Sequence, residues 1–144
     1  MILKRNGPRV KNATKTKVDE HTFDSKMEAL RYIELKRLQQ AGIVKEIELQ
    51  PVFTLQPGYW KCCECHEVWG SADMKKGKCR ICGGKTPKTM AIVYRADFRV
   101  TYKDGHQEIE DVKGMETEIF KLKRKMFEYR YPDLTLKVVK GVRR

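Results

Sequence analysis

The sequence predicts a small α/β domain whose strands are interrupted by a cysteine-rich insert. The chain has 144 residues, of which 40% are hydrophobic and 35% charged, a composition that suits one folded core. Helical and alternating apolar spacings follow one another in the order α-β-(insert)-β-β-α-β. Four of the five cysteines form two closely spaced pairs between two predicted strands.

The first predicted helix begins after Asp24. Ser25 and Glu28 form a capping-box pattern, and Gly42 can end the helix. Residues 43–55 then indicate a strand, in which Pro51 forces an edge or a bulge. The apolar positions with helical spacing are Met27, Leu30, Ile33 or Glu34, Leu38 and Ala41.

Strand character resumes after the insert, over residues 91–102, and the Asp104-Gly105 pair predicts a hairpin turn before a return strand at 108–113. A helix over 116–131, closed by Pro132, and a last strand at 134–139 follow. The strand over residues 91–102 is expected to have Ala96, Phe98, Val100 and Tyr102 on one face. The helix over residues 116–131 is expected to have an apolar stripe made of Ile119, Leu122, Met126 and Tyr129.

The predicted organisation has three parts. Residues 1–20 form a basic N-terminal arm, residues 21–56 and 90–144 form the core, and residues 57–89 form an inserted zinc-binding module. No stretch approaches the roughly 18 apolar residues that a membrane helix needs, and the first residues lack the apolar run of a secretory signal. We therefore expect a protein of a reducing cytoplasm, where cysteines bind metal or stay free.

The charge of the chain predicts an anionic partner. Lys and Arg number 31 against 19 Asp and Glu, which gives a formal net charge of +12. Basic residues crowd both ends of the chain, and basic arms of this kind suit contacts with phosphates. Nucleic acid is the expected partner, although charge alone does not distinguish a protein that cuts it from one that only binds it.

The cysteine pairs predict a zinc site. Cys62 and Cys65 form one knuckle, and Cys79 and Cys82 form the other, each with two residues between its cysteines. Four thiolates at this spacing suit tetrahedral Zn²⁺ and leave no open position for a substrate, so the predicted role is structural. Four neighbours leave alternatives open: Cys63 or His66 could replace a ligand, and Trp60 and Trp69 could stack on bases or pack around the zinc.

Acidic residues and a lysine form a second candidate site. Asp111 and Lys113 lie on one face of a predicted strand, because alternate residues of a strand share a face. A two-residue turn would pair position 97 with 112, whereas a three-residue loop ending at Gly105 would pair Asp97 with Asp111. The second pairing would suit a shared Mg²⁺ or Mn²⁺, with Glu28 as a further ligand. Taken singly, each residue also fits a purely structural role.

These residues give the chain a resemblance to the PD-(D/E)XK nuclease superfamily, and in particular to small, mostly phage-encoded members of it. The sequence is also similar to the nuclease subunit of some cut-and-paste bacterial transposons. The resemblance covers roughly residues 17–139 outside the insert. It is carried by four segments, Phe23-Asp24-Ser25-Lys26-x-Glu28-Ala29, Glu48-Leu49-Gln50-Pro51, Tyr94-x-Ala96-Asp97-Phe98 and Glu110-Asp111-Val112-Lys113-Gly114.

The resemblance implies a restriction-endonuclease-like αβββαβ core with a mixed central sheet, and an Mg²⁺-dependent deoxyribonuclease. Asp97 would match the first acid of the motif, Asp111 the second and Lys113 its lysine. Glu28 would be the helix acid, and Gln50 would line the site. Ala96 stands where the motif name has Pro, and Glu110 would compete with Asp111 if the register shifted.

The resulting hypothesis is a metal-dependent DNA endonuclease, acting as a homodimer on branched or duplex DNA in phage recombination, replication or packaging. Resolution of Holliday junctions is one such activity, and the protein would then be located in the cytoplasm of the bacterial host. The alternative is a zinc-stabilised DNA- or RNA-binding module without catalysis, which accounts equally well for the charge and the cysteines. A phage protein that blocks a host factor is a third hypothesis, without a sequence feature of its own.

Overall fold

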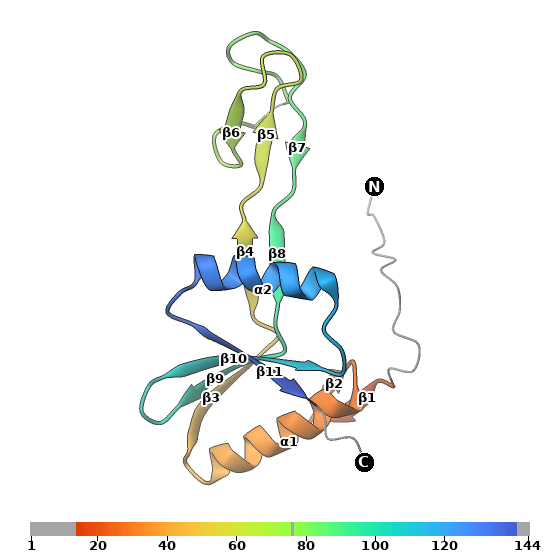
Figure 1. Cartoon of the computed structure of the whole chain (residues 1–144), viewed down its shortest axis with the longest axis vertical. Helices are drawn as coiled ribbons and strands as arrows, with labels where there is room; N and C mark the ends of the chain where they lie inside the picture. Colours follow the sequence, from red (N-terminus) through yellow and green to blue (C-terminus); the bar gives the residue numbers. More distant parts are fainter. Residues whose placement is uncertain (1–13, 76, 141–144) are drawn as a thin grey trace.

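The protein is a mixed α/β domain with a long protruding ribbon (Figure 1). The structure is a computed structural model that describes residues 14–75 and 77–140. Most of the predicted N-terminal arm, Lys76 and the C-terminal Arg143 and Arg144 lie outside the described residues. The elements are β1 Thr16–Val18, β2 His21–Phe23, α1 Lys26–Gln40, β3 Val44–Leu49, β4 Val52–Gln56, β5 Tyr59–Lys61, β6 Val68–Gly70, β7 Lys88–Thr89, β8 Ile92–Arg95, β9 Phe98–Tyr102, β10 Gln107–Lys113, α2 Glu118–Arg130 and β11 Thr135–Lys140.

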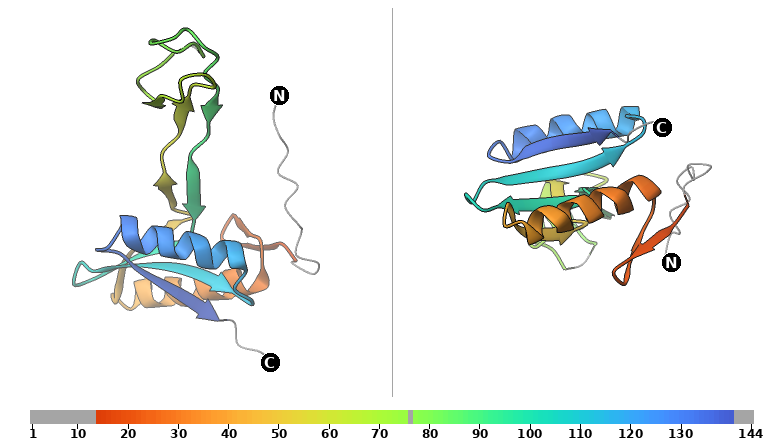
Figure 2. Two further views of the ribbon diagram at one scale, coloured as in Figure 1. Left: turned by 45° about the horizontal axis from the view of Figure 1, so that its top comes forward. Right: turned by 90° about the horizontal axis from the view of Figure 1, so that it is seen from below.

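A four-stranded mixed sheet forms the centre of the domain, in the order β11-β10-β9-β3. β10 pairs parallel with β11 and antiparallel with β9, which in turn pairs antiparallel with β3. Figure 2 shows α1 and α2 on opposite faces of this sheet. Each helix therefore covers its own hydrophobic cluster, one built on Phe98 and Val100 and the other on Ile109 and Leu136.

Helix α1 begins where the capping-box pattern predicts. The Ser25 hydroxyl accepts a hydrogen bond from the Glu28 backbone N–H at 3.2 Å, and Gly42, with φ +77°, ends the last turn. The buried residues are Ala29, Tyr32 and Leu35, so the predicted apolar stripe is offset from the real one. Leu30, which belongs to the predicted stripe, is 55% exposed.

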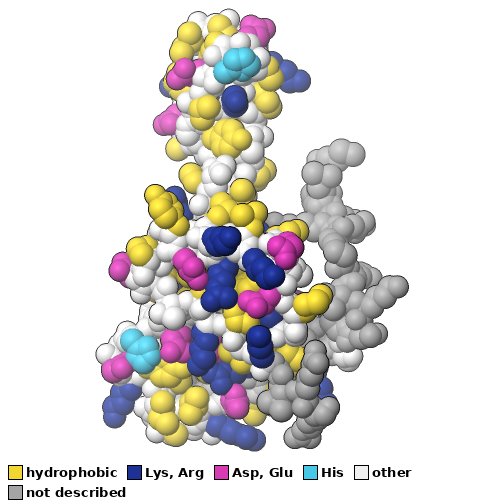
Figure 3. Space-filling view, viewed as in Figure 1, with side chains coloured by type: hydrophobic (Ala, Val, Ile, Leu, Met, Phe, Trp, Pro, Cys, Tyr) yellow, Lys and Arg dark blue, Asp and Glu magenta, His cyan; other side chains and the backbone are white. Residues whose placement is uncertain are grey.

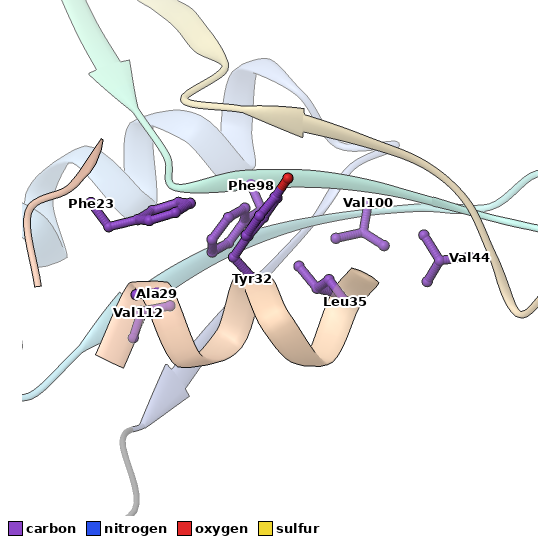
Figure 4. Close-up of a cluster of buried hydrophobic side chains, with 8 residues drawn as sticks. All are labelled: Phe23, Ala29, Tyr32, Leu35, Val44, Phe98, Val100 and Val112. Carbon is purple, nitrogen blue, oxygen red and sulfur yellow. The ribbon is translucent and has the colours of Figure 1, made fainter. Parts of the chain in front are cut away.

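Aromatic packing explains which face of α1 turns inward. Tyr32 lies parallel to Phe98 of the sheet, with ring centroids 6.5 Å apart, and its centroid is 5.0 Å from that of Phe23 (Figure 4). Aromatic side chains bury more area than Leu or Ile, and their packing dominates a core of this size. Helical spacing of aliphatic residues alone is therefore a poor guide to the inner face here.

Both predicted long strands are broken beside the sheet. β3 stops before Gln50 and Pro51, and β8 stops before Ala96 and Asp97, so β4 and β8 pair separately as a two-stranded ribbon. The breaks lie side by side, because the Gln50 N–H donates to the Asp97 carbonyl at 2.9 Å and the Ala96 N–H donates to the Pro51 carbonyl at 3.1 Å. The predicted common face is therefore wrong for Ala96, which packs under α2 while Phe98 packs under α1.

The cysteine-rich segment forms a separate three-stranded sheet in the order β6-β5-β7. This sheet lies at the far end of the β4–β8 ribbon, away from both helices (Figure 1). The predicted insertion point between two strands corresponds to the tip of that ribbon.

Helix α2 begins after the N-cap Thr117, whose hydroxyl accepts a hydrogen bond from the Phe120 N–H at 3.2 Å. Its buried residues are Phe120 and Phe127. The predicted apolar stripe exists, but it faces outward, since Ile119, Leu122 and Tyr129 are exposed. No helix of the described chain is long and apolar enough to cross a membrane.

Candidate functional site

The β9–β10 hairpin has the register of the three-residue loop. Glu110 pairs with Phe98, the Tyr102 N–H donates to the His106 carbonyl at 3.0 Å, and Gly105 has φ +93°. Continuing this register by one residue brings Asp97 opposite Asp111. Of the two predicted alternatives, the one that brings these two acids together is correct.

Asp97 lies at the break between β8 and β9, next to β10. One of its carboxylate oxygens accepts a hydrogen bond from the Val112 N–H at 2.7 Å. Burial, together with the negative charges of Glu28 and Asp111, raises the pKa of Asp97 to about 7, although the hydrogen bond from the Val112 N–H and the charge of Lys113 oppose the shift. The carboxyl group is therefore held in an environment that disfavours its charged form.

Asp111 is almost completely buried, with 2% exposure, and both of its oxygens have partners. One lies 3.2 Å from the Lys113 ammonium, and the other accepts a hydrogen bond from the Tyr94 hydroxyl at 2.5 Å. Burial, followed by the Asp111 charge, raises the pKa of Tyr94 well above its ordinary value. Lys113 also lies over the ring of Phe120, 5.0 Å from its centroid, so the first turn of α2 fixes its direction.

Glu28 has two roles in the geometry. It closes the capping box, because its carboxylate accepts a hydrogen bond from the Ser25 hydroxyl at 3.3 Å. It also lines a cavity of about 210 Å³ together with Asp97 and Gln50. Burial raises the pKa of Glu28, and the charges of Asp24 and Asp111 add to this.

Gln50 reaches the cavity through an unusual backbone conformation. Its φ of +50° is in the left-handed region, which a residue with a side chain rarely adopts. The hydrogen bond from its N–H to the Asp97 carbonyl holds it there, beside the acid it is predicted to accompany. Strain of this kind is concentrated at functional sites.

Three residues near the predicted ones were missed. His21 and Thr22 line the cavity from the β1–β2 hairpin, whose three-residue strands carry too short a pattern to predict. Tyr94 lies in one of the motif segments, but its hydroxyl has no predicted role, although a buried Tyr in an apolar strand requires a hydrogen-bond partner. That requirement was the available signal.

The predicted residues are brought near one another without forming a compact ligand set. Asp111 and Lys113 are not among the residues that line the cavity. Among the described residues, the only group with three or more metal-ligand atoms all within 4.8 Å of one another is the cysteine group. The carboxylate oxygens of Glu28, Asp97 and Asp111 therefore do not all lie within that distance of one another.

Glu110 does not compete with Asp111. It is fully buried and accepts two hydrogen bonds from the Arg31 guanidinium, at 2.8 and 2.7 Å. Since Arg31 lies on α1, Glu110 points to the α1 face of the sheet while Asp111 points to the α2 face. The Glu110 carboxylate raises the pKa of Arg31 above its already high value.

Cys62, Cys65, Cys79 and Cys82 bring their sulfur atoms within 4.8 Å of one another. The Cys62–Cys82 and Cys65–Cys79 sulfur distances are both 3.5 Å. Four thiolates around a tetrahedral zinc with Zn–S bonds of about 2.3 Å would lie roughly 3.8 Å apart, so the arrangement is compatible with a metal such as zinc. Of the two alternatives Cys62 and Cys63, Cys62 belongs to this group, whereas Cys63 is exposed and lies outside it.

Tight turns prepare these thiols for a cation. Backbone N–H groups of Glu64, Ile81 and Gly84 each donate to a cysteine sulfur at 3.4 Å. Hydrogen bonds from the backbone of Cys65, the largest influence, lower the pKa of Cys62 to about 6. Backbone hydrogen bonds act in the same direction on Cys65, but burial and hydrogen bonds with the other cysteine thiols outweigh them and raise its pKa to about 12. Thiolate is the form that binds metal, so the local backbone favours the ligand state.

The two tryptophans pack on the small sheet. Trp60 and Trp69 pair across β5 and β6. Lys88 lies 5.7 Å from the ring centroid of Trp60, and Arg80 lies 5.6 Å from that of Trp69. Both rings are therefore engaged within the module.

A comparison with protein families gives one match. A family described as "Protein of unknown function (DUF1064)" matches residues 9–144. No curated protein and no solved structure matches the chain.

Proposed function

The chain belongs to the DUF1064 family, and we propose that it is a metal-dependent DNA endonuclease. The observation that carries the proposal is the register of β9 and β10, which brings Asp97 opposite Asp111. Lys113 follows Asp111 by two residues and contacts its carboxylate. Two acids and a lysine at the junction of these strands are the residues that the PD-(D/E)XK resemblance requires. The order α1-β3-β9-β10-α2-β11 agrees with the αβββαβ core that the resemblance implies.

Glu28, Asp97 and Asp111 would hold an Mg²⁺ or Mn²⁺ ion, which would supply positive charge to a phosphate and acidity to a bound water. Carboxylate oxygens are the donors that these cations prefer. Asp111 would have to exchange its contact with Lys113 for the cation, since the ammonium now lies 3.2 Å from one of its oxygens. Lys113, released in this way, would face the phosphate and stabilise its developing charge.

DNA is the proposed substrate because the chain carries a formal charge of +12. Figure 3 shows Lys and Arg side chains gathered over α2 on one face of the molecule. Five basic residues lie within that helix, Lys121, Lys123, Arg124, Lys125 and Arg130. Contacts of this type bind the phosphate backbone without selecting a sequence.

We assign a structural zinc ion to the four cysteines, which would hold the tip of the ribbon in shape. A site with four protein thiolates has no open position for a substrate. The basic side chains beside it, Arg80 and Lys88, suit a second contact with the phosphates of the nucleic acid.

One observation favours the alternative of a zinc-stabilised nucleic-acid-binding module. The oxygens of the three carboxylates do not all lie within 4.8 Å of one another, as the cysteine sulfurs do. The module would bind nucleic acid without cutting it, and the same experiment distinguishes the two functions.

The test is cleavage of supercoiled plasmid and of a four-way junction with Mg²⁺, with Mn²⁺ and with EDTA. Asp97→Asn and Lys113→Ala should each lower the cleavage rate by about a hundredfold or more, because each removes a group that stabilises the transition state. Lys103→Ala is the matched control, since Lys103 is an exposed lysine in the turn of the same hairpin. Retention of DNA without cleavage in either metal would refute the nuclease and support the binding module.

A further inference from the structure

Helix α2 exposes an apolar stripe on its outer face. Ile119, Leu122 and Tyr129 are 68%, 60% and 91% exposed, and Met115, which precedes the N-cap Thr117, is 78% exposed. Phe120 and Phe127, on the opposite side of the helix, already supply its contact with the sheet. A continuous exposed apolar surface of this kind marks an interaction site.

The spacing of the stripe fits a second helix. With the half-buried Met126, the four positions within α2 follow one another at intervals of three, four and three residues. These are the a and d positions of a heptad, in which side chains of one helix fit between those of another. The stripe therefore has the pattern of a helix-to-helix seam.

The two ends of the stripe differ. At the C-terminal end, Leu55, Met126, Tyr129, Arg130 and Tyr131 line a hollow of about 680 Å³. At the N-terminal end, Met115 and Ile119 are exposed side chains. An antiparallel two-fold arrangement brings the N-terminal end of each stripe toward the hollow of the other, as a symmetric interface requires.

The flanking charges select the antiparallel direction. Glu118 and Lys125 occupy equivalent heptad positions on one side of the stripe. With Ile119 opposite Leu122 of the partner subunit, Glu118 lies beside Lys125 of the partner subunit, and symmetry repeats this pair. A parallel arrangement would instead bring Lys125 beside Arg130 of the partner subunit, two like charges.

We propose that α2 is a dimerisation surface that pairs antiparallel with α2 of a second copy of this chain. The proposal does not depend on nuclease activity. A 13-residue helix is about 20 Å long, so the seam is short, and we expect a dimer of micromolar affinity.

Sedimentation of the full chain at concentrations of about 1 to 100 µM tests the proposal. The mass should rise with concentration from 16.9 kDa toward twice that value. Leu122→Glu should raise the dissociation constant at least tenfold, because symmetry introduces two carboxylates into the seam. Leu122 is exposed in the protomer, so this variant should melt as the wild type does.

A charge exchange tests the direction of pairing. Glu118→Lys should weaken the dimer, and Glu118→Lys combined with Lys125→Glu should restore it, because the pair is rebuilt with opposite sign. Ile43→Glu is the control, since Ile43 is 50% exposed at the end of α1 and should not affect the mass. A monomer at every concentration, an unchanged dimer in Leu122→Glu, or failure of the double exchange would overturn the proposal. If Leu122→Glu loses DNA retention without a change of mass, the stripe binds nucleic acid instead, and this result would also overturn the dimerisation proposal.

Discussion

Replacing Arg31 by alanine should leave the Glu110 carboxylate buried without a cation beside it. Glu110 has 0% exposure and accepts both of its charged hydrogen bonds from Arg31. Breaking a buried ion pair by removing one partner typically costs about 3–5 kcal/mol of unfolding free energy. Domains of this size are stable by about 5–15 kcal/mol, so Arg31→Ala should remove about a fifth of the total or more.

Replacing Glu110 should cost less unfolding free energy than replacing Arg31. Arg31 has a side-chain exposure of 16% and a second carboxylate, Glu34, at 2.7 Å, so its charge stays compensated when Glu110 is removed. Glu110→Gln should therefore cost less, about 1–3 kcal/mol, mainly through weakened hydrogen bonds. Replacing both, as Arg31→Met with Glu110→Leu, removes both buried charges and should be more stable than Arg31→Ala alone.

Urea unfolding at pH 7 measures these costs. With a slope of about 2 kcal/mol per molar urea, the midpoint of Arg31→Ala should fall by about 1.5–2.5 M. Arg124→Ala is the control, because its pairs with Glu116 and Glu128 lie at the surface and should contribute at most about 1 kcal/mol. A loss below about 1 kcal/mol for Arg31→Ala, or a double variant no more stable than it, would refute the reasoning.

Two further predictions concern Asp97 and the cysteines. Without added metal, the raised pKa of Asp97 means that its carboxyl group keeps a proton in the folded protein which it releases above about pH 4 in the unfolded chain. The free energy of unfolding should therefore fall as the pH rises toward 7. Thermal melts from pH 5 to 8 should show this decline in the wild type and a flatter profile in Asp97→Asn, and identical profiles would contradict it. Cys62→Ser should lower the zinc content measured by atomic emission, whereas Cys63→Ser should retain about one zinc per chain, and equal losses would count against the assigned ligands.

Signals that act over a few residues were readable from the sequence. The Ser25–Glu28 cap, the Gly42 terminator and the two cysteine pairs all depend on backbone geometry within one turn. Their positions in the structure agree with the pattern for this reason. The α/β class and the order of the main strands and helices followed from the same local periodicity.

Faces and breaks were harder to predict, because they depend on partners far away in the chain. The strands predicted over 43–55 and 91–102 break together at Gln50 and Asp97, where each satisfies the backbone of the other. Tyr94 and Arg31 matter because of Asp111 and Glu110, partners that no spacing in the sequence reveals. The candidate site was therefore predicted in its acids and lysine but not in the groups that hold them.

By itself, the sequence determined the order of the main strands and helices, the members of the cysteine group except for the choice between Cys62 and Cys63, and the acidic residues of the candidate site. Only the tertiary structure decided the hairpin register and the outer face of α2. The physical reason is that two turn lengths and two apolar stripes were each locally possible. Packing of Phe120 and Phe127 against the sheet turned one stripe inward and left the other exposed.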